Sequence, residues 1–168
     1  MISITDATSP AQLEAVRDLM RAFIAWHRQR HTQDLHLIDA YFDPAALEEE
    51  LATLPGAYSP PSGRLLLATY DDAPAGCVAL RRIDAQRCEM KRMFVYPQLQ
   101  GRGIGLALAR RVIEDARSSG YRTMLLDTSI RQAEAQALYS RLGFEIIPPY
   151  YELPADLRGW LIFMELSL

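Results

Sequence analysis

The sequence predicts a mixed α/β fold in which one sheet carries helices on both faces. Three observations lead to this prediction. Strand-like and helix-like apolar patterns follow one another in the order β-α-α-β-β-β-α-β-α-β-β. Three of these strands are consecutive and are separated by short turns, as in antiparallel hairpins. An apolar strand end near residue 95 then runs into a glycine-rich turn and a long amphipathic helix.

The first half of the chain predicts one strand, two helices and a loop. The strand alternates apolar and polar residues, each helix begins at a proline, and the loop is rich in Pro, Gly and Ser. Residues 27–39 are polar and give only a weak signal. The predicted elements are a strand around Ile2 and Ile4, a helix from Pro10 to Trp26, a helix over 45–54 and a loop over 55–63.

The second half predicts the hairpins and the helices that follow them. Glycines at 120 and 143 end the two helices, because glycine readily adopts the left-handed conformation that closes a helix. A turn centred on residues 84–86 pairs residue 77 with about residue 93. The predicted elements are strands at 64–70, 75–83 and 89–96, a helix at 103–119, a strand at 124–127, a helix at 133–142, and strands at 144–147 and 160–166.

Length and composition predict one soluble domain over residues 1–168. The 168 residues are 49% hydrophobic and 23% charged, which is ordinary for a globular protein. A net charge of −3 gives no general attraction to nucleic acid or to an anionic membrane, and no apolar run is long enough for a transmembrane helix. The N-terminus lacks the features of a signal peptide, and two cysteines are too few for a disulfide framework. We therefore expect a cytoplasmic protein with free, buried thiols at Cys77 and Cys88.

The glycine-rich turn is the strongest functional signal. Gly101, Gly103 and Gly105 let the backbone approach a ligand, and the following helix presents unpaired N–H groups and partial positive charge. Such a site binds phosphate or pyrophosphate. Neither the dinucleotide fingerprint nor the Walker pattern is present, and the segment fits Q/R-x-x-G-x-G/A instead. The alternative is a glycine-rich turn with only a structural role.

A second segment, residues 132–144, makes the interpretation specific. It fits N-x-x-A-x-x-L-Y-x-x-x-G-F except at its first position, where Gln132 replaces the usual asparagine. With this pair of segments the chain resembles the GNAT superfamily of acyl-CoA N-acyltransferases over residues 89–144. The resemblance implies a mixed, mostly antiparallel sheet of six to seven strands. It also implies that the fourth and fifth strands, near 88–96 and 123–128, splay apart to admit the pantetheine arm.

The resemblance also implies acetyl-CoA as co-substrate, with its pyrophosphate held by backbone N–H groups of the glycine loop. A bulge within residues 93–95 would free one further backbone N–H for the thioester carbonyl. Arg102 would add positive charge, or would be a solvated loop residue. The positions that the resemblance gives to the cofactor are Met93, Phe94, Val95, Gln100, Gly101, Arg102, Gly103, Ile104, Gly105, Leu106 and Gln132.

Two side chains are candidates for proton transfer. Tyr139 would protonate the departing thiolate, since a phenol with a pKa of about 10 can share a proton with a thiol. The alternative for Tyr139 is a core residue on an amphipathic helix. Glu89 would deprotonate the amine, or would form an ion pair with Arg81 or Lys91. His27, His31 and His36 are further candidates for the base, and no metal-binding spacing is present.

The acceptor is the least determined part of the sequence. By resemblance, residues 27–58 and 148–159 form its site, the latter with a possible aromatic wall at residues 150 and 151. We expect the amine of a small molecule; a protein acceptor, or a module that binds coenzyme A without catalysis, are the alternatives. The sequence leaves open whether the chain forms a homodimer. A carboxylate on the acceptor would be oriented by a basic cluster, or the cluster is a solvated face; it comprises Arg81, Arg82, Arg87, Lys91 and Arg92.

Overall fold

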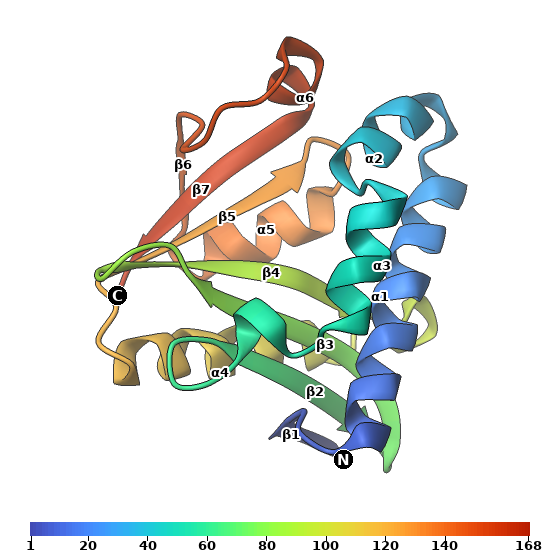
Figure 1. Cartoon of the computed structure of the whole chain (residues 1–168), viewed down its shortest axis with the longest axis vertical. Coiled ribbons are helices and arrows are strands. Elements are labelled where there is room, and N and C mark those ends of the chain that lie inside the picture. The colour runs from blue at the N-terminus through green and yellow to red at the C-terminus, as the bar shows by residue number, and fades with distance from the viewer.

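A computed structural model describes all residues from Met1 to Leu168. A seven-stranded sheet runs through the molecule in the order β1-β2-β3-β4-β5-β7-β6 (Figure 1). Only the β4–β5 pair is parallel, and all other neighbours are antiparallel. The predicted mixed sheet is therefore confirmed. Its strands are β1 (Ile2–Asp6), β2 (Arg64–Tyr70), β3 (Ala73–Arg82), β4 (Arg87–Val95), β5 (Thr123–Ser129), β6 (Glu145–Ile147) and β7 (Leu161–Ser167).

Six α-helices accompany the sheet. They are α1 (Pro10–Arg30), α2 (Leu35–Tyr41), α3 (Pro44–Ala52), α4 (Ile104–Ser118), α5 (Ala133–Arg141) and α6 (Ala155–Trp160). The sequence did not predict α2 and α6, and the predicted end of α1 was four residues early. Both missed helices are short, and they form where their buried side chains, Ile38 and Trp160, anchor them to the rest of the fold. Tertiary packing therefore decides their conformation rather than local periodicity.

The helices bury both faces of the sheet. In Figure 1, α1 and α3 cross in front of the strands and α4 lies behind them. On the α4 face a core of 21 residues includes Leu66 and Val78, and on the α1 face a core of 18 residues includes Leu65 and Cys77. Neighbouring residues of β2 and β3 thus point into different cores. Because both faces are buried, these strands appear in the sequence as continuous apolar runs rather than as alternating ones.

The strands β4 and β5 separate soon after they meet. They pair only over Arg87–Glu89 and Thr123–Leu125, and then diverge, as the resemblance implied (Figure 1). On its other side β4 contains a bulge against β3, because Ala79 faces Lys91 whereas Cys77 faces Phe94. Two residues of β4 therefore stand opposite one residue of β3.

The bulge itself is confirmed, but its predicted position was one residue late. It falls on Arg92 and Met93, with Arg92 in the left-handed region at φ +57°. An arginine tolerates this conformation here because Glu50 on α3 holds its guanidinium, with Nε–Oε2 at 3.0 Å. A long-range contact thus decides where the extra residue is accommodated, and the sequence around the strand end does not reveal it.

The two cysteines are free and buried, as predicted. Cys77 lies in β3 and Cys88 in β4, and each thiol donates to a backbone carbonyl, those of Arg92 and Thr123. Burial raises the pKa of both thiols to about 12. No helix of the fold combines the length and the apolar character needed to cross a membrane.

Candidate active site

The divergence of β4 and β5 is accompanied by two adjoining cavities. A large cleft of about 590 Å³ lies at the start of α4 and along α5. A smaller pocket of about 50 Å³ lies between β4, β5 and the helices α1, α2 and α6. Phe23, Met93 and Gln132 line both cavities. The two cavities therefore meet beside the bulge of β4, so a ligand in one can contact a ligand in the other.

The glycine loop forms one wall of the large cleft. Gly101 and Gly103 have φ values of +79° and +82°, and open space surrounds the position where a Cβ would stand on either of them. Gly103 is the N-cap of α4, and Ala107 is the first residue whose N–H bonds back to it, at 3.0 Å. The N–H groups of the intervening first turn have no helical acceptor, so they can bind an anion.

The predicted cofactor positions converge on this cleft, with one exception. Ten of them line it: Met93, Phe94, Val95, Gln100, Gly101, Gly103, Ile104, Gly105, Leu106 and Gln132. Arg102 turns away instead. Its guanidinium donates to the hydroxyl of Tyr70 at 3.1 Å and lies 5.2 Å from the centre of that ring. In this structure Arg102 is a loop residue that packs on β2.

The edge of β4 is open toward the cleft. Beyond Glu89, the side of β4 that faces β5 has no strand partner. One group on this segment is satisfied by a side chain, because Gln100 Nε2 donates to the carbonyl of Val95 at 3.2 Å. The unpaired edge offers backbone donors at the place where the two cavities meet.

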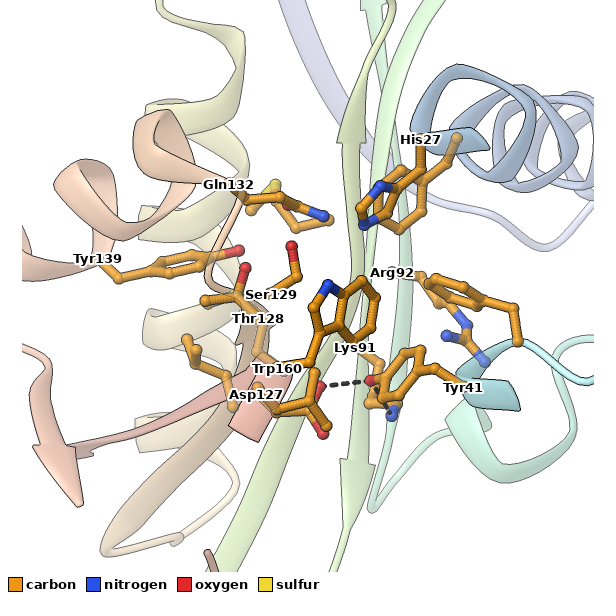
Figure 2. Close-up of a pocket in the computed structure, with 16 residues that line it drawn as sticks. His27, Tyr41, Lys91, Arg92, Asp127, Thr128, Ser129, Gln132, Tyr139 and Trp160 are labelled. Carbon is orange, nitrogen blue, oxygen red and sulfur yellow. Dashed lines mark hydrogen bonds between the residues drawn. The ribbon is translucent and has the colours of Figure 1, made fainter. Parts of the chain in front are cut away.

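The smaller pocket is lined by aromatic and polar side chains from several segments (Figure 2). Its lining residues are Phe23, His27, Tyr41, Phe42, Met90, Lys91, Arg92, Met93, Leu126, Asp127, Thr128, Ser129, Gln132, Tyr139, Trp160 and Leu161. Tyr139 is 6% exposed, and its hydroxyl points into the pocket near Thr128 and Ser129 (Figure 2). Burial, reinforced by the charge of Asp127, raises the pKa of Tyr139, so the phenol keeps its proton at neutral pH.

Glu89 occupies a different place from Tyr139. Its side chain is 1% exposed and lines neither cavity. One carboxylate oxygen accepts from Arg81 Nε at 2.6 Å, and the other accepts from the hydroxyl of Tyr150. The ion pair with Arg81, which the sequence offered as the alternative role of Glu89, is therefore present. Within this pair the side chain of Glu89 is buried, whereas that of Arg81 is exposed.

The carboxylate that does line the pocket is Asp127, which was not among the predicted site residues. The hydroxyls of Tyr41 and Tyr151 donate to its two oxygens, the second at 2.5 Å. A signal for Asp127 existed, because it is an acidic residue directly after the apolar run of a buried strand. Of its tyrosine partners, Tyr151 belongs to the aromatic wall that the sequence suggested, whereas Tyr41 lies in α2, which was not predicted.

Of the three histidines, His27 lines the pocket, His31 is buried behind it and His36 is exposed. His27 is 1% exposed and stacks on Trp160, with ring centres 5.7 Å apart. Burial, together with the charge of His31, lowers the pKa of His27 to about 4, so its imidazole is neutral at neutral pH. No group of three or more His, Cys, Asp or Glu side chains comes close enough together to hold a metal ion.

Comparisons with known proteins agree with this geometry. A family model described as the acetyltransferase (GNAT) family matches residues 20–144. An uncharacterized N-acetyltransferase of Schizosaccharomyces pombe is 32% identical over 91% of this chain and 88% of its own length. The N-acetylaspartate synthetase of Danio rerio is 34% identical over 77% of this chain and 47% of its own length. The PaiA N-acetyltransferase of Thermoplasma acidophilum, solved in complex with coenzyme A, has the same fold. Its TM-score is 0.74 at 19% identity, with 100% of this chain and 99% of that chain covered.

Proposed function

This chain belongs to the GNAT acetyltransferase family, and on that premise we propose that it moves an acetyl group from acetyl-CoA to the primary amine of a small molecule. It is an acyl-CoA N-acyltransferase, and its family uses acetyl-CoA. The observation that carries the proposal is the junction of two unlike cavities at Met93 and Gln132. One cavity suits a long phosphorylated ligand, and the other suits a small polar one.

The large cleft fits coenzyme A by the chemistry of its donors. The two positive-φ glycines leave room at the loop, and the first turn of α4 presents free N–H groups to a pyrophosphate. Bound acetyl-CoA supplies a thioester that is reactive toward amines. In this proposal β4 polarises the thioester carbonyl, because its unpaired edge near Met93 donates a backbone N–H to the carbonyl oxygen.

Tyr139 is the proposed general acid. Its hydroxyl points into the pocket, makes no hydrogen bond to another protein group, and is kept protonated by its raised pKa. A protonated phenol with a free O–H can give its proton to the departing thiolate sulfur. The structural alternative, a tyrosine buried for packing alone, is less well supported because the hydroxyl faces the pocket rather than the core.

Glu89 is the proposed general base, and it acts through an intervening group. Its carboxylate does not reach the pocket, so a proton must travel to it through a hydroxyl or a water molecule. Tyr150 donates to Glu89 but lines neither cavity, so the rest of the path to the amine needs a water molecule. Comparison of pH–rate profiles distinguishes this role from that of a buried ion pair.

A small acceptor is favoured over a protein acceptor by the size and lining of the pocket. The cavity is about 50 Å³ and is bordered by Trp160, Tyr41 and Phe42. A named relative, the N-acetylaspartate synthetase of Danio rerio, has a small acetylated molecule in its name. Both observations support a small amine as the acceptor.

The test is thiol release from acetyl-CoA by the purified chain. We expect release with at least one member of a library of small primary amines, and slower release with peptides that have free N-termini or lysines. Acetyl-CoA should raise the melting temperature more than NAD or ATP, because a ligand that binds only the folded state stabilises it. A preference for peptides would replace the small-molecule proposal, and a larger shift with NAD or ATP would contradict the assignment of the cleft.

A further inference from the structure

The five basic residues of the central hairpin are not equivalent in the structure. Arg81 is paired with Glu89, Arg87 with Asp84 and Arg92 with Glu50. Arg82 is exposed and faces solvent. Lys91 alone lines the small pocket without an ion pair.

The surroundings of Lys91 leave its ammonium group poorly satisfied. Its one hydrogen bond goes to the hydroxyl of Tyr41 at 3.4 Å, and Nζ lies 5.5 Å from the centre of that ring. Asp127 is close by in Figure 2, but its oxygens accept from the hydroxyls of Tyr41 and Tyr151, and no ion pair joins it to Lys91. An ammonium has three donors, so Lys91 retains capacity for an anionic ligand.

Arg92 cannot serve the same purpose, although it also lines the pocket. Glu50 holds its guanidinium through two hydrogen bonds, at 3.0 Å and 3.1 Å, and the side chain is only 13% exposed. The guanidinium also lies over the ring of Phe42. Arg92 therefore stabilises the bulge of β4, whereas the charge of Lys91 is free to act on a ligand.

A partly buried ammonium without a counter-ion is costly, because desolvation disfavours the charged form. Burial lowers the pKa of Lys91, and the charges of Asp127 and Glu89 offset this only in part. A carboxylate bound in the pocket would supply the missing partner and would restore the preference for the charged form. An acceptor without a negatively charged group would therefore leave the Lys91 ammonium unpaired.

We propose that Lys91 binds a carboxylate on the acceptor, so that the acceptor is a small amino acid or a related aminocarboxylate. This inference rests on the proposed N-acetyltransferase function. Lys91 lies beside Tyr41 and Asp127, while Gln132, which also lines the cleft, lies at the far side of the pocket (Figure 2). A molecule anchored by its carboxylate at Lys91 presents its amine toward the junction of the two cavities.

The first experiment compares acceptors that differ only in the carboxylate. Glycine, L-alanine and β-alanine are each assayed against their carboxamides, by thiol release from acetyl-CoA. The carboxamides keep the primary amine and nearly the same shape, and their amine has a lower pKa, so a preference for the carboxylate cannot come from a larger supply of free amine. For the wild-type chain we expect kcat/KM to be at least tenfold higher for the carboxylate member of the best pair.

The second experiment removes the charge. Lys91→Met should lower kcat/KM for the carboxylate acceptor by roughly tenfold to a thousandfold, mainly through KM, the range for losing one partner of a desolvated charge pair. The same variant should leave the carboxamide almost unaffected. Arg82→Met is the matched control, because it removes one positive charge from the same hairpin at an exposed position. It should keep the wild-type preference, and both variants should keep the melting shift with acetyl-CoA.

The outcomes distinguish the role of Lys91 from the proposed acetyltransferase function. Thiol release that favours the carboxamides, or an equal loss on both acceptor types in Lys91→Met, would overturn the role of Lys91 while the acetyltransferase function stands. No thiol release with any amine, in a chain that still binds acetyl-CoA, would overturn the proposed function itself. If Lys91→Met does not fold, Lys91→Gln and the comparison of acceptor pairs with the wild-type chain still test the role of Lys91.

Discussion

The two cavities recognise their ligands by different means. The large cleft is lined by residues within 23–30, 93–95, 99–106 and 132–141, and its proposed anion site consists of backbone N–H groups at the start of α4. The small pocket is built from side chains of β4 and β5 together with side chains of several helices. Tyr41 comes from α2, Lys91 from β4 and Asp127 from β5. One site is thus encoded locally in the chain, and the other is assembled by the fold.

This difference explains why the two sites are so unequally visible in the sequence. A backbone site needs particular φ angles and the absence of side chains, and glycine at fixed spacing reports both. A side-chain site needs only that suitable groups meet in space. Many residues can supply such groups, and no local pattern marks them. Changes in the large cleft should therefore act through backbone geometry, and changes in the small pocket through side-chain chemistry.

The largest effect is expected for Gly103→Asp in the cleft. This change places a β-carbon and a negative charge at a residue with φ +82°, beside the proposed pyrophosphate site. We expect acetyl-CoA to bind more than about a hundredfold more weakly, which abolishes a melting shift worth about 2.7 kcal/mol at a hundred times the dissociation constant. Isothermal titration and thermal melting with acetyl-CoA measure it.

Two controls separate charge from strain. Gly103→Asn has nearly the same size but no charge, and asparagine tolerates the left-handed region, so part of the affinity should remain. Gly120→Asp introduces the same strain at φ +87° beyond the other end of α4. It should destabilise the fold without a specific loss of acetyl-CoA binding. Full binding by Gly103→Asp would mean that the loop is a structural turn.

The second effect concerns Tyr139, which lines the small pocket. Tyr139→Phe removes only the hydroxyl, so acetyl-CoA affinity should stay close to wild type. The turnover number should fall by about tenfold to a thousandfold, the range for losing a proton donor. Steady-state kinetics and titration on one preparation compare the two quantities. An unchanged turnover number, with chemistry shown to be rate-limiting, would leave Tyr139 as a packing residue.

The third effect is a pH dependence of stability on the pocket side. The pKa of His27 is about 4 in the folded chain and 6.5 when exposed, so the unfolded state binds more protons between these values. The stabilisation is complete above pH 6.5 and is lost as the pH falls toward 4. Its full size is about 3 kcal/mol by proton linkage.

Denaturant unfolding at a series of pH values from 7 to 4 tests this expectation. His27→Gln should flatten the slope between pH 6.5 and 4, because the substituted side chain does not titrate. His36→Gln is the control, since His36 is exposed on α2, and it should leave the slope unchanged. Equal slopes in wild type and His27→Gln would show that the burial of His27 carries no proton linkage.

The smallest effect is expected for Glu89→Gln. If Glu89 is the base, turnover should fall about tenfold near neutral pH, and the deficit should shrink as the pH approaches the pKa of the amine. Because Glu89 is fully buried, the change should also cost about 1 to 2 kcal/mol of stability. The matched control is Arg81→Gln, which breaks the same ion pair but keeps the carboxylate. A wild-type pH profile in Glu89→Gln, with the stability loss alone, would assign Glu89 to the ion pair.

Most of the framework could be predicted from the sequence. The predicted strand over residues 64–70 agrees in both bounds with β2, and the long helix agrees with α4 to within one residue at each end. These elements have strong periodicity and clear glycine or proline boundaries, so local signals suffice. The helices α2 and α6 escaped prediction because their conformation depends on what Ile38 and Trp160 pack against.

The sequence by itself determined the strongly periodic strands and helices, the glycine loop and the resemblance to the family, because these depend on residues that lie close together in the chain. Tertiary structure alone decided that the bulge falls on Arg92, held by Glu50 from 42 residues away. It also decided that Asp127 meets Tyr41, and that Lys91 is the one basic residue of the pocket without an ion pair. The physical reason is that hydrogen bonds and ion pairs depend on distance in space. The fold sets that distance, and the spacing of residues along the chain does not.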